Sequence, residues 1–147
     1  MDAISRVPQK SLLAAVALVA GMLAGCAQVQ SVMPGPSHLT LSGSNEVPPV
    51  TTPASATGNF KVNDDKSVSG SITTTGMVPT AAHIHMAAAG SNGPVIIPLT
   101  KYENTFSAPA GARLTDEQYA AYKAGKLYVN VHSNDNKGGE VRAQLVP

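Results

Sequence analysis

From residue 38 onward, apolar and polar residues alternate in short runs with a period of two. Glycine, proline, asparagine and aspartate separate these runs, which are HLTLSG, TGNFKVN, SVSGSITTT, AAHIHM, PVIIPL, NTFSAP, KLYVNVHS and GEVRAQLV. Successive side chains of a strand point to opposite faces of a sheet, so this period is typical of strands with one buried face. The segments NDDKS (63–67) and SNDNKGG (133–139) lie between two such runs and are candidates for hairpin loops.

One segment carries helical signals instead. LTDEQYAAYKAGK places Thr115 just before Asp116 and Glu117, and it ends at Gly125. Threonine is a favoured N-cap, acidic residues stabilise the first turn, and glycine commonly follows the last turn. The sequence therefore predicts an all-β protein. It would be an antiparallel β-sandwich or a flattened Greek-key barrel of about 7–8 strands, with one short helix at about 115–124.

The phase of the alternation predicts which side chains share a face. In KLYVNVHS the aliphatic residues Leu127, Val129 and Val131 lie on one face, which we expect to enter the core. The opposite, outer face of this strand and of two others is predicted to carry polar and aromatic residues. They are His83, His85, Tyr128, Asn130, His132, Arg142 and Gln144.

Three of the four histidines fall on this predicted outer face. His83 and His85 stand two positions apart on a strand, with Cβ atoms about 6–7 Å apart, so both rings can reach one ion. His132, from a neighbouring strand, would complete a set of three imidazoles. Such a set suits copper or zinc and leaves one coordination position open. The alternative is that all three are surface residues that hydrogen-bond to loops such as SNGP.

Two further residues of the outer face, and the fourth histidine, have less specific roles. Tyr128 and Asn130 would either hydrogen-bond to the histidines or simply fill the outer face of the sheet. His38 begins the first predicted strand and is expected to be a solvated residue rather than a fourth ligand.

The N-terminus predicts export. Arg6 and Lys10 precede the apolar run LLAAVALVAGML (12–23), which is shorter than the ~20 residues that a membrane-spanning helix needs. A basic start followed by a short apolar run describes a secretory signal peptide, which we assign to residues 1–25.

The apolar run ends in LAGC (23–26), which resembles a bacterial lipobox. This resemblance implies that Cys26 is lipidated and becomes the first residue of the mature chain. Ala27, rather than aspartate, follows it, which in enterobacterial lipoproteins implies the outer membrane. Residues 26–37 would then be the lipidated cysteine and a tether, and residues 38–147 the folded domain.

Composition excludes several classes of protein. Lysine and arginine total 10 and aspartate and glutamate 9, for a net charge of +1, so no basic excess predicts nucleic-acid binding. Cys26 is the only cysteine, so the domain has no disulfide. The sequence contains no Ser/His/Asp nucleophile pattern, no glycine-rich phosphate loop and no pair of carboxylates placed by a motif.

Three blocks resemble the CHRD domain, which is named after the repeats of chordin. They are LSGSNEVPPVTTPASATGNF, AAHIHMAAAGSNGPVIIPL and LTDEQYAAYKAGKLYVNVHSNDNKGGEVRAQLV, in the order of the family, and they cover about residues 38–146. The resemblance implies an all-β domain found in exported bacterial proteins and in chordin, an extracellular antagonist of bone morphogenetic proteins. It implies no catalytic residues.

A weaker similarity concerns the copper half-site of Cu,Zn superoxide dismutases. His83 and His85 form a His-x-His strand motif, His132 ends a later strand before a loop, and Arg142 follows near a glycine pair. The similarity implies copper ligation by the histidines and guidance of an anion by Arg142. The sequence has no counterpart of the bridging histidine, of the zinc-ligand cluster or of the cysteine pair.

These observations favour a binding protein over an enzyme. The first hypothesis is a lipid-anchored protein of the bacterial cell envelope that binds copper or zinc through the three histidines, with Tyr128, Asn130 and Arg142 around them. The second is a metal-free interaction module that binds another envelope protein or an extracellular ligand. The third is a redox enzyme similar to superoxide dismutase. In each case the lipid on Cys26 would hold the protein at a membrane.

Overall fold

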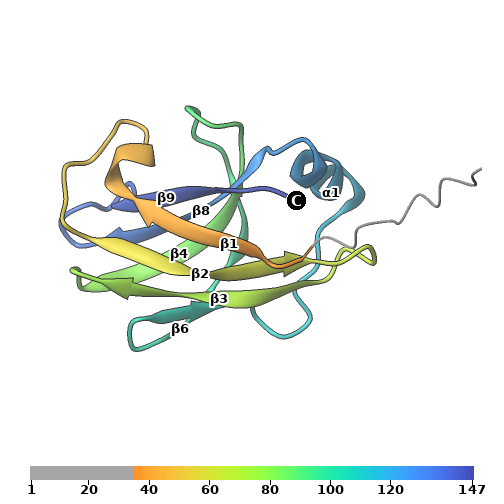
Figure 1. The fold of residues 1–147 in the computed structure, drawn as a ribbon, viewed down its shortest axis with the longest axis horizontal. Coiled ribbons are helices and arrows are strands. Elements are labelled where there is room, and N and C mark those ends of the chain that lie inside the picture. Colours follow the sequence, from red (N-terminus) through yellow and green to blue (C-terminus); the bar gives the residue numbers. More distant parts are fainter. Residues whose placement is uncertain (1–34) are drawn as a thin grey trace, which may run out of the picture. The chain divides into compact units, whose positions relative to one another are not determined.

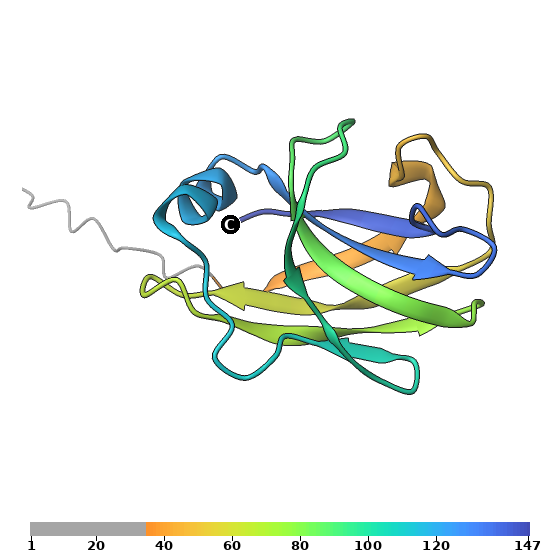
Figure 2. The same cartoon turned by 180° about the vertical axis from the view of Figure 1, so that it is seen from behind.

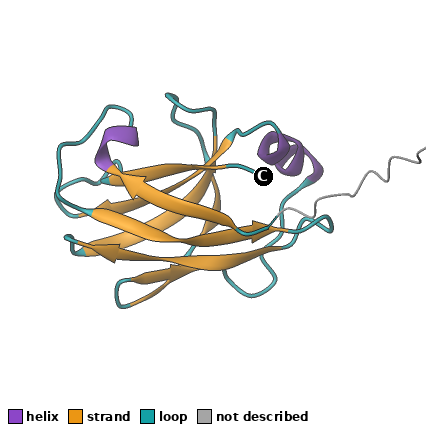
Figure 3. Ribbon diagram, viewed as in Figure 1, coloured by secondary structure: helices purple, strands orange, loops and turns teal. Residues whose placement is uncertain are grey.

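The computed structural model describes residues 35–147, so the predicted signal peptide, Cys26 and most of the tether lie outside the described residues. Nine strands, one 3₁₀ turn and one α-helix follow one another (Figure 3). In chain order they are β1 (Ser37–Ser42), η1 (Gly43–Asn45), β2 (Ser55–Val62), β3 (Val68–Thr75), β4 (Pro79–Met86), β5 (Val95–Pro98), β6 (Thr100–Tyr102), β7 (Thr105–Ser107), α1 (Asp116–Lys123), β8 (Leu127–Ser133) and β9 (Val141–Leu145). The predicted all-β fold with one short helix is confirmed.

The alternation predicts one strand fewer than the structure contains, and the missing strand is β6. All three of its residues are exposed, and it pairs only with β7 at the edge of the sheet. An edge strand that buries neither face has no alternation to detect. The other eight strands coincide with the eight alternating runs.

The strands form a single sheet that curls into a flattened, nearly closed barrel. Their order is β5-β4-β8-β9-β1-β2-β3-β7-β6, and neighbouring strands are antiparallel. In Figures 1 and 2, β4, β8 and β9 lie across the core from β1, β2 and β3. The two halves join through a single residue pair, Ser42 with Arg142. On the other side, the ammonium of Lys101 donates a hydrogen bond to the carbonyl of Pro79 at 2.6 Å.

The core consists of the aliphatic faces that the alternation predicts. Leu127, Val129 and Val131 of β8 are fully buried, and they face Phe60 and Ile72 from the opposite half. Burial of such a side chain contributes about 1.5–3 kcal/mol relative to exposure. The core therefore fixes which face of β8 carries its polar residues.

The helix begins and ends where the sequence predicts. The hydroxyl of Thr115 accepts a hydrogen bond from the backbone N–H of Gln118 at 3.2 Å, and the side chain of Gln118 accepts from the N–H of Thr115 at 2.9 Å. Gly125 follows with a φ of 68°, which ends the helix. No helix within residues 35–147 is long and apolar enough to cross a membrane.

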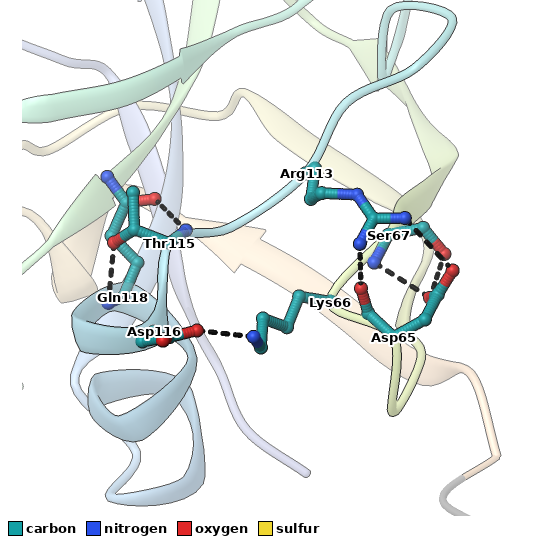
Figure 4. Close-up of polar contacts among 7 residues, drawn as sticks. All are labelled: Asp65, Lys66, Ser67, Arg113, Thr115, Asp116 and Gln118. Atoms are coloured by element: carbon teal, nitrogen blue, oxygen red, sulfur yellow. Dashed lines mark hydrogen bonds and ion pairs between the residues drawn. The ribbon is translucent and has the colours of Figure 1, made fainter.

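Polar contacts fasten the start of α1 to the hairpin between β2 and β3 (Figure 4). The ammonium of Lys66 pairs with the carboxylate of Asp116, and the guanidinium of Arg113 lies 3.3 Å from a carboxylate oxygen of Asp65. The N–H of Leu114 donates to the carbonyl of Lys66 at 2.9 Å. Both predicted hairpin loops are present, and the loop between β2 and β3 also positions the helix.

Candidate metal centre

The face of β4, β8 and β9 that points away from the core is covered by two loops. Residues 43–54 and 87–94 stand over this face (Figures 1 and 2). The relative exposure is 7% for His85, 2% for Tyr128 and 1% for Arg142. The predicted phase of these residues is therefore correct, since they lie on the face that points away from the core, but the two loops enclose part of that face. Alternation along a strand contains no information about a loop that folds over it.

Strand register brings the three histidines together. In the pairing of β4 with β8, His83 lies opposite Asn130, and His85 lies opposite Tyr128. His132 lies opposite Ala81, so it is diagonal to His83. One ring nitrogen from each histidine can be chosen such that all three lie within 4.8 Å of one another. His83 and His132 are the closest pair, with Nδ1 of His83 3.0 Å from Nε2 of His132.

Two backbone carbonyls fix the proton positions on two of the rings. Nδ1 of His85 lies 3.0 Å from the carbonyl oxygen of Gly93, and Nδ1 of His132 lies 2.9 Å from that of Lys137. A carbonyl only accepts, so each Nδ1 donates a proton. In the neutral rings, Nε2 of both histidines then holds a free lone pair, which is the form that binds a metal.

The Nε2 atom of His85 is buried and has no hydrogen-bond partner. The Nε2 of His132 faces His83, whose Nδ1 must donate the shared proton because His132 has no proton on that nitrogen. The three rings therefore present one unpartnered lone pair and one bridging proton to a common point between them.

Burial keeps two of these imidazoles neutral. It lowers the pKa of His83 below the ordinary 6.5, and the neighbouring His132 and His85 lower it further. Burial also lowers the pKa of His132, an effect that the hydrogen bond to Lys137 opposes and the proximity of His85 reinforces. Both rings are thus in the ligating form at neutral pH.

The spacing of the nitrogens is close to what a shared ion requires. Ligand bonds of about 2.0–2.1 Å place two coordinating nitrogens roughly 2.8–4.2 Å apart, from a right angle at the metal to a linear arrangement. The His83–His132 pair, at 3.0 Å, lies within this range, and the widest separation in the set is up to 4.8 Å. Small side-chain rotations, without movement of the strands, would bring all three nitrogens to one ion.

His85 is the first layer of a three-layer stack that also contains Tyr128 and Arg142. The ring of Tyr128 is parallel to the imidazole, with an interplanar angle of 5° and a centroid separation of 4.6 Å. The guanidinium carbon of Arg142 lies 3.4 Å from the centroid of the Tyr128 ring. Tyr128 therefore contacts His85 directly, and Arg142 contacts Tyr128.

Arg142 holds the covering loop 87–94. Its guanidinium donates to the carbonyls of Ala88 and Ser91, at 3.3 and 2.8 Å, and to the side chain of Asn92 at 3.2 Å. A residue that guides anions needs an accessible charge, whereas Arg142 is 1% exposed. The anion-guiding role implied by the similarity to superoxide dismutases has no support here.

Glu46, in the other covering loop, is a buried residue that no pattern in the sequence indicates. It is 4% exposed, and its Oε1 has no hydrogen-bond partner. Burial raises the pKa of Glu46 to about 7, although Arg142, the Asn130 side chain and the N–H of Val47 offset part of the rise. The fourth histidine, His38, is exposed on β1, as expected, and is not among the clustered residues.

Comparison with known families identifies the domain. A sequence model of the CHRD domain matches residues 38–145. The match spans well over half of the chain, so the chain belongs to the CHRD domain family. No curated protein and no solved structure matches the chain, and the similarity to superoxide dismutases gains no support from these comparisons.

Proposed function

We propose that this CHRD-domain protein binds copper or zinc through His83, His85 and His132. The observation that carries the proposal is the buried, unpartnered Nε2 of His85 beside the ligand atoms of the other two histidines. An unsatisfied buried polar atom costs about 1–3 kcal/mol. An ion would remove this cost, because it accepts the lone pair that nothing else in the site uses.

An ion suits this position better than a water molecule. Nε2 of His85 is inaccessible to solvent, so no water reaches it without movement of its neighbours. A ligand bond of about 2.0–2.1 Å is much shorter than a hydrogen bond of ~2.9 Å, so an ion lies closer to the ring than a water could. Three imidazoles suit copper and zinc, and on affinity alone copper(II) is favoured over zinc.

The backbone contacts of the rings support the same assignment. Metal-binding histidines commonly donate their second N–H to a carbonyl or a carboxylate, which fixes the ring and the tautomer. His85 does so to Gly93, and His132 to Lys137. These contacts orient two nitrogens toward the third histidine before any ion binds.

We further propose that the protein is exported and anchored by lipid at Cys26 in the bacterial cell envelope, at the outer membrane. The basic start, the apolar run at 12–23 and the lipobox-like LAGC support this location. A fully extended tether of residues 27–37 would reach at most ~36 Å, which would keep the metal site near the membrane surface. Mass spectrometry of the mature N-terminus tests the anchor. Cys26→Ser should abolish lipidation, and an unmodified Cys26 or cleavage elsewhere would refute the anchor.

Calorimetric titration of copper and of zinc into the purified protein tests the metal site. Alanine at any one of His83, His85 or His132 should sharply weaken binding, because each change removes one of three ligands. His38→Ala is the matched control and should bind as the wild type does. If the wild type binds no more tightly than the His83→Ala, His85→Ala double variant, the metal proposal fails. The metal-free interaction module then becomes the leading hypothesis.

A further inference from the structure

We infer that Tyr128 and Arg142 are positioning residues for the proposed ligand His85. They hold the imidazole in one plane and place a fixed positive charge near the ion. The inference rests on the proposed metal binding and specifies how the ion's coordination geometry and redox preference would be set.

The plane of the His85 ring is constrained on its face and at its edge. The Tyr128 ring lies parallel to it at 4.6 Å, which prevents the imidazole from tilting toward that side. The Gly93 carbonyl accepts from Nδ1 at 3.0 Å, which prevents rotation within the ring plane. The direction of the lone pair on Nε2 is therefore set before an ion arrives.

Arg142 secures both constraints at once. Its guanidinium covers the face of Tyr128 that is turned away from His85, at 3.4 Å. The same guanidinium bonds to three residues of loop 87–94, and this loop supplies the Gly93 carbonyl. The N–H of Gly93 also donates to the hydroxyl of Tyr128 at 3.3 Å. Loss of Arg142 would loosen the stack and the carbonyl contact together.

The charge on Arg142 is buried without an ion-pair partner among residues 35–147. All of its side-chain hydrogen bonds go to neutral oxygens, and the ion pairs of the described chain involve Lys66 and Arg113 instead. Glu46 is the carboxyl group whose titration responds to Arg142, and burial raises the pKa of Glu46 to about 7. Near neutral pH this carboxyl is therefore only partly ionised, and it leaves much of the arginine charge uncompensated.

A fixed positive charge near a copper ion favours the ion's lower charge state. Repulsion is stronger for copper(II) than for copper(I), and low-dielectric surroundings screen it little. Arg142 should therefore raise the reduction potential of bound copper. The stack should also narrow the range of geometries that the copper(II) ion adopts.

The test combines electron paramagnetic resonance and voltammetry on the full, copper-loaded protein. Tyr128→Leu removes the stacked ring, and Arg142→Gln removes the charge and the planar cation. Both should change the copper(II) hyperfine splitting, and Tyr128→Leu should weaken copper binding by about 10–100-fold, the usual effect of losing a group that orients a ligand. Arg142→Gln should also lower the reduction potential. Tyr128→Phe keeps the ring but removes the hydroxyl that accepts from the N–H of Gly93, so its spectrum should shift less than that of Tyr128→Leu.

Two exposed residues provide matched controls. Tyr102→Leu and Arg113→Gln make the same chemical changes away from the histidines and should alter neither spectrum nor potential. Arg142→Lys keeps a buried charge without the planar group. It should therefore retain a potential near that of the wild type while its hyperfine splitting changes.

The outcomes separate the two proposals. Absence of both copper and zinc binding by the wild type would refute the metal proposal itself, and binding of zinc alone would overturn the inference about bound copper. Wild-type binding, combined with unchanged spectra and potentials in folded Tyr128→Leu and Arg142→Gln, would overturn the positioning role alone. If Tyr128→Leu does not fold, the two Arg142 variants decide. Equal potentials for Arg142→Gln and Arg142→Lys would then count against the role of the charge.

Discussion

Nδ1 of His83 lies 3.0 Å from Nε2 of His132, although the two residues are 49 positions apart in the chain. Nδ1 of His132 already donates to the Lys137 carbonyl, so the proton between the two histidines belongs to His83. An ion bound between these rings would replace that proton, and His83 would carry its proton on Nε2 instead. A metal ion could thus replace the hydrogen bond between the two histidines with little movement of the strands.

Metal binding should raise the thermal stability of the protein. An ion bound only by the folded state at 100 times its Kd adds about 2.7 kcal/mol to the free energy of unfolding. For a domain of this size, the melting temperature should rise by roughly 5–15 °C. Differential scanning calorimetry with zinc, and again after addition of a chelator, measures the effect. His132→Ala should show no metal-dependent rise, and an equal rise in that variant would place the ion elsewhere.

The cap of α1 should contribute measurably to stability. Thr115→Ala removes the side-chain acceptor for the N–H of Gln118, and it should lower the free energy of unfolding by about 0.5–2 kcal/mol. Thr51→Ala, at an exposed loop position, should change it by less than about 0.5 kcal/mol. Urea titrations of both variants provide the comparison. Equal stability of the two would show that the cap contributes nothing.

Local signals in the sequence were sufficient for every strand except the edge strand β6, for the helix and for the face that carries the histidines. The phase of Leu127 and Val129 determined which side of β8 enters the core, and Thr115 and Gly125 marked the ends of the helix. These features depend on residues close together in the chain and on which face is buried. Such information is present in the period of the pattern.

The surroundings of the histidines could not be predicted in the same way. The carbonyls of Gly93 and Lys137 belong to the backbone, so no residue type identifies them. The burial of Arg142 depends on a loop that folds back over the sheet. Neither the alternation of β9 nor the charge of Arg142 indicates that burial. Long-range placement of loops therefore decides whether a polar face is a solvated surface or an enclosed site.

The stability contribution of Glu46 should depend on pH. Below pH 4.5, its carboxyl is protonated in both the folded and unfolded states and has no differential effect. Between 4.5 and about 7 the unfolded state ionises first, so this group lowers stability as the pH rises. Glu46→Gln removes that penalty. The variant should be more stable than the wild type at pH 8, by up to about 3 kcal/mol, and equally stable at pH 4.

Chemical unfolding of the wild type and of Glu46→Gln across this pH range measures the difference. The lowered pKa values of His83 and His132 have the opposite effect on stability. The unfolded state protonates these histidines at a higher pH than the folded state does, so they lower the stability as the pH falls. They are common to both proteins and cancel in the comparison. The exposed Glu103→Gln is the matched control and should show no such trend. A difference that does not vary with pH would mean that the Glu46 carboxyl has its ordinary pKa.

Two adjacent glycines should differ sharply in their tolerance of alanine. Gly139 has a φ of 132°, and a Cβ there would lie 2.5 Å from Oε1 of Glu46 and 2.7 Å from Nδ2 of Asn130. A Cβ on Gly138 would have no atom within 4 Å. Gly139→Ala combines backbone strain with displacement of two buried polar groups, so it should cost about 1–3 kcal/mol or more.

Gly138→Ala should change the free energy of unfolding by less than about 0.5 kcal/mol, because its position is open and its φ is not in the left-handed region. Urea unfolding of the two variants at pH 8 gives the difference directly. The comparison also tests the enclosure of the polar face, because part of the penalty at Gly139 arises from Glu46 packed beneath the hairpin between β8 and β9. If both variants unfold with the wild-type midpoint, the loop of residues 43–54 does not hold Glu46 against Asn130 in solution.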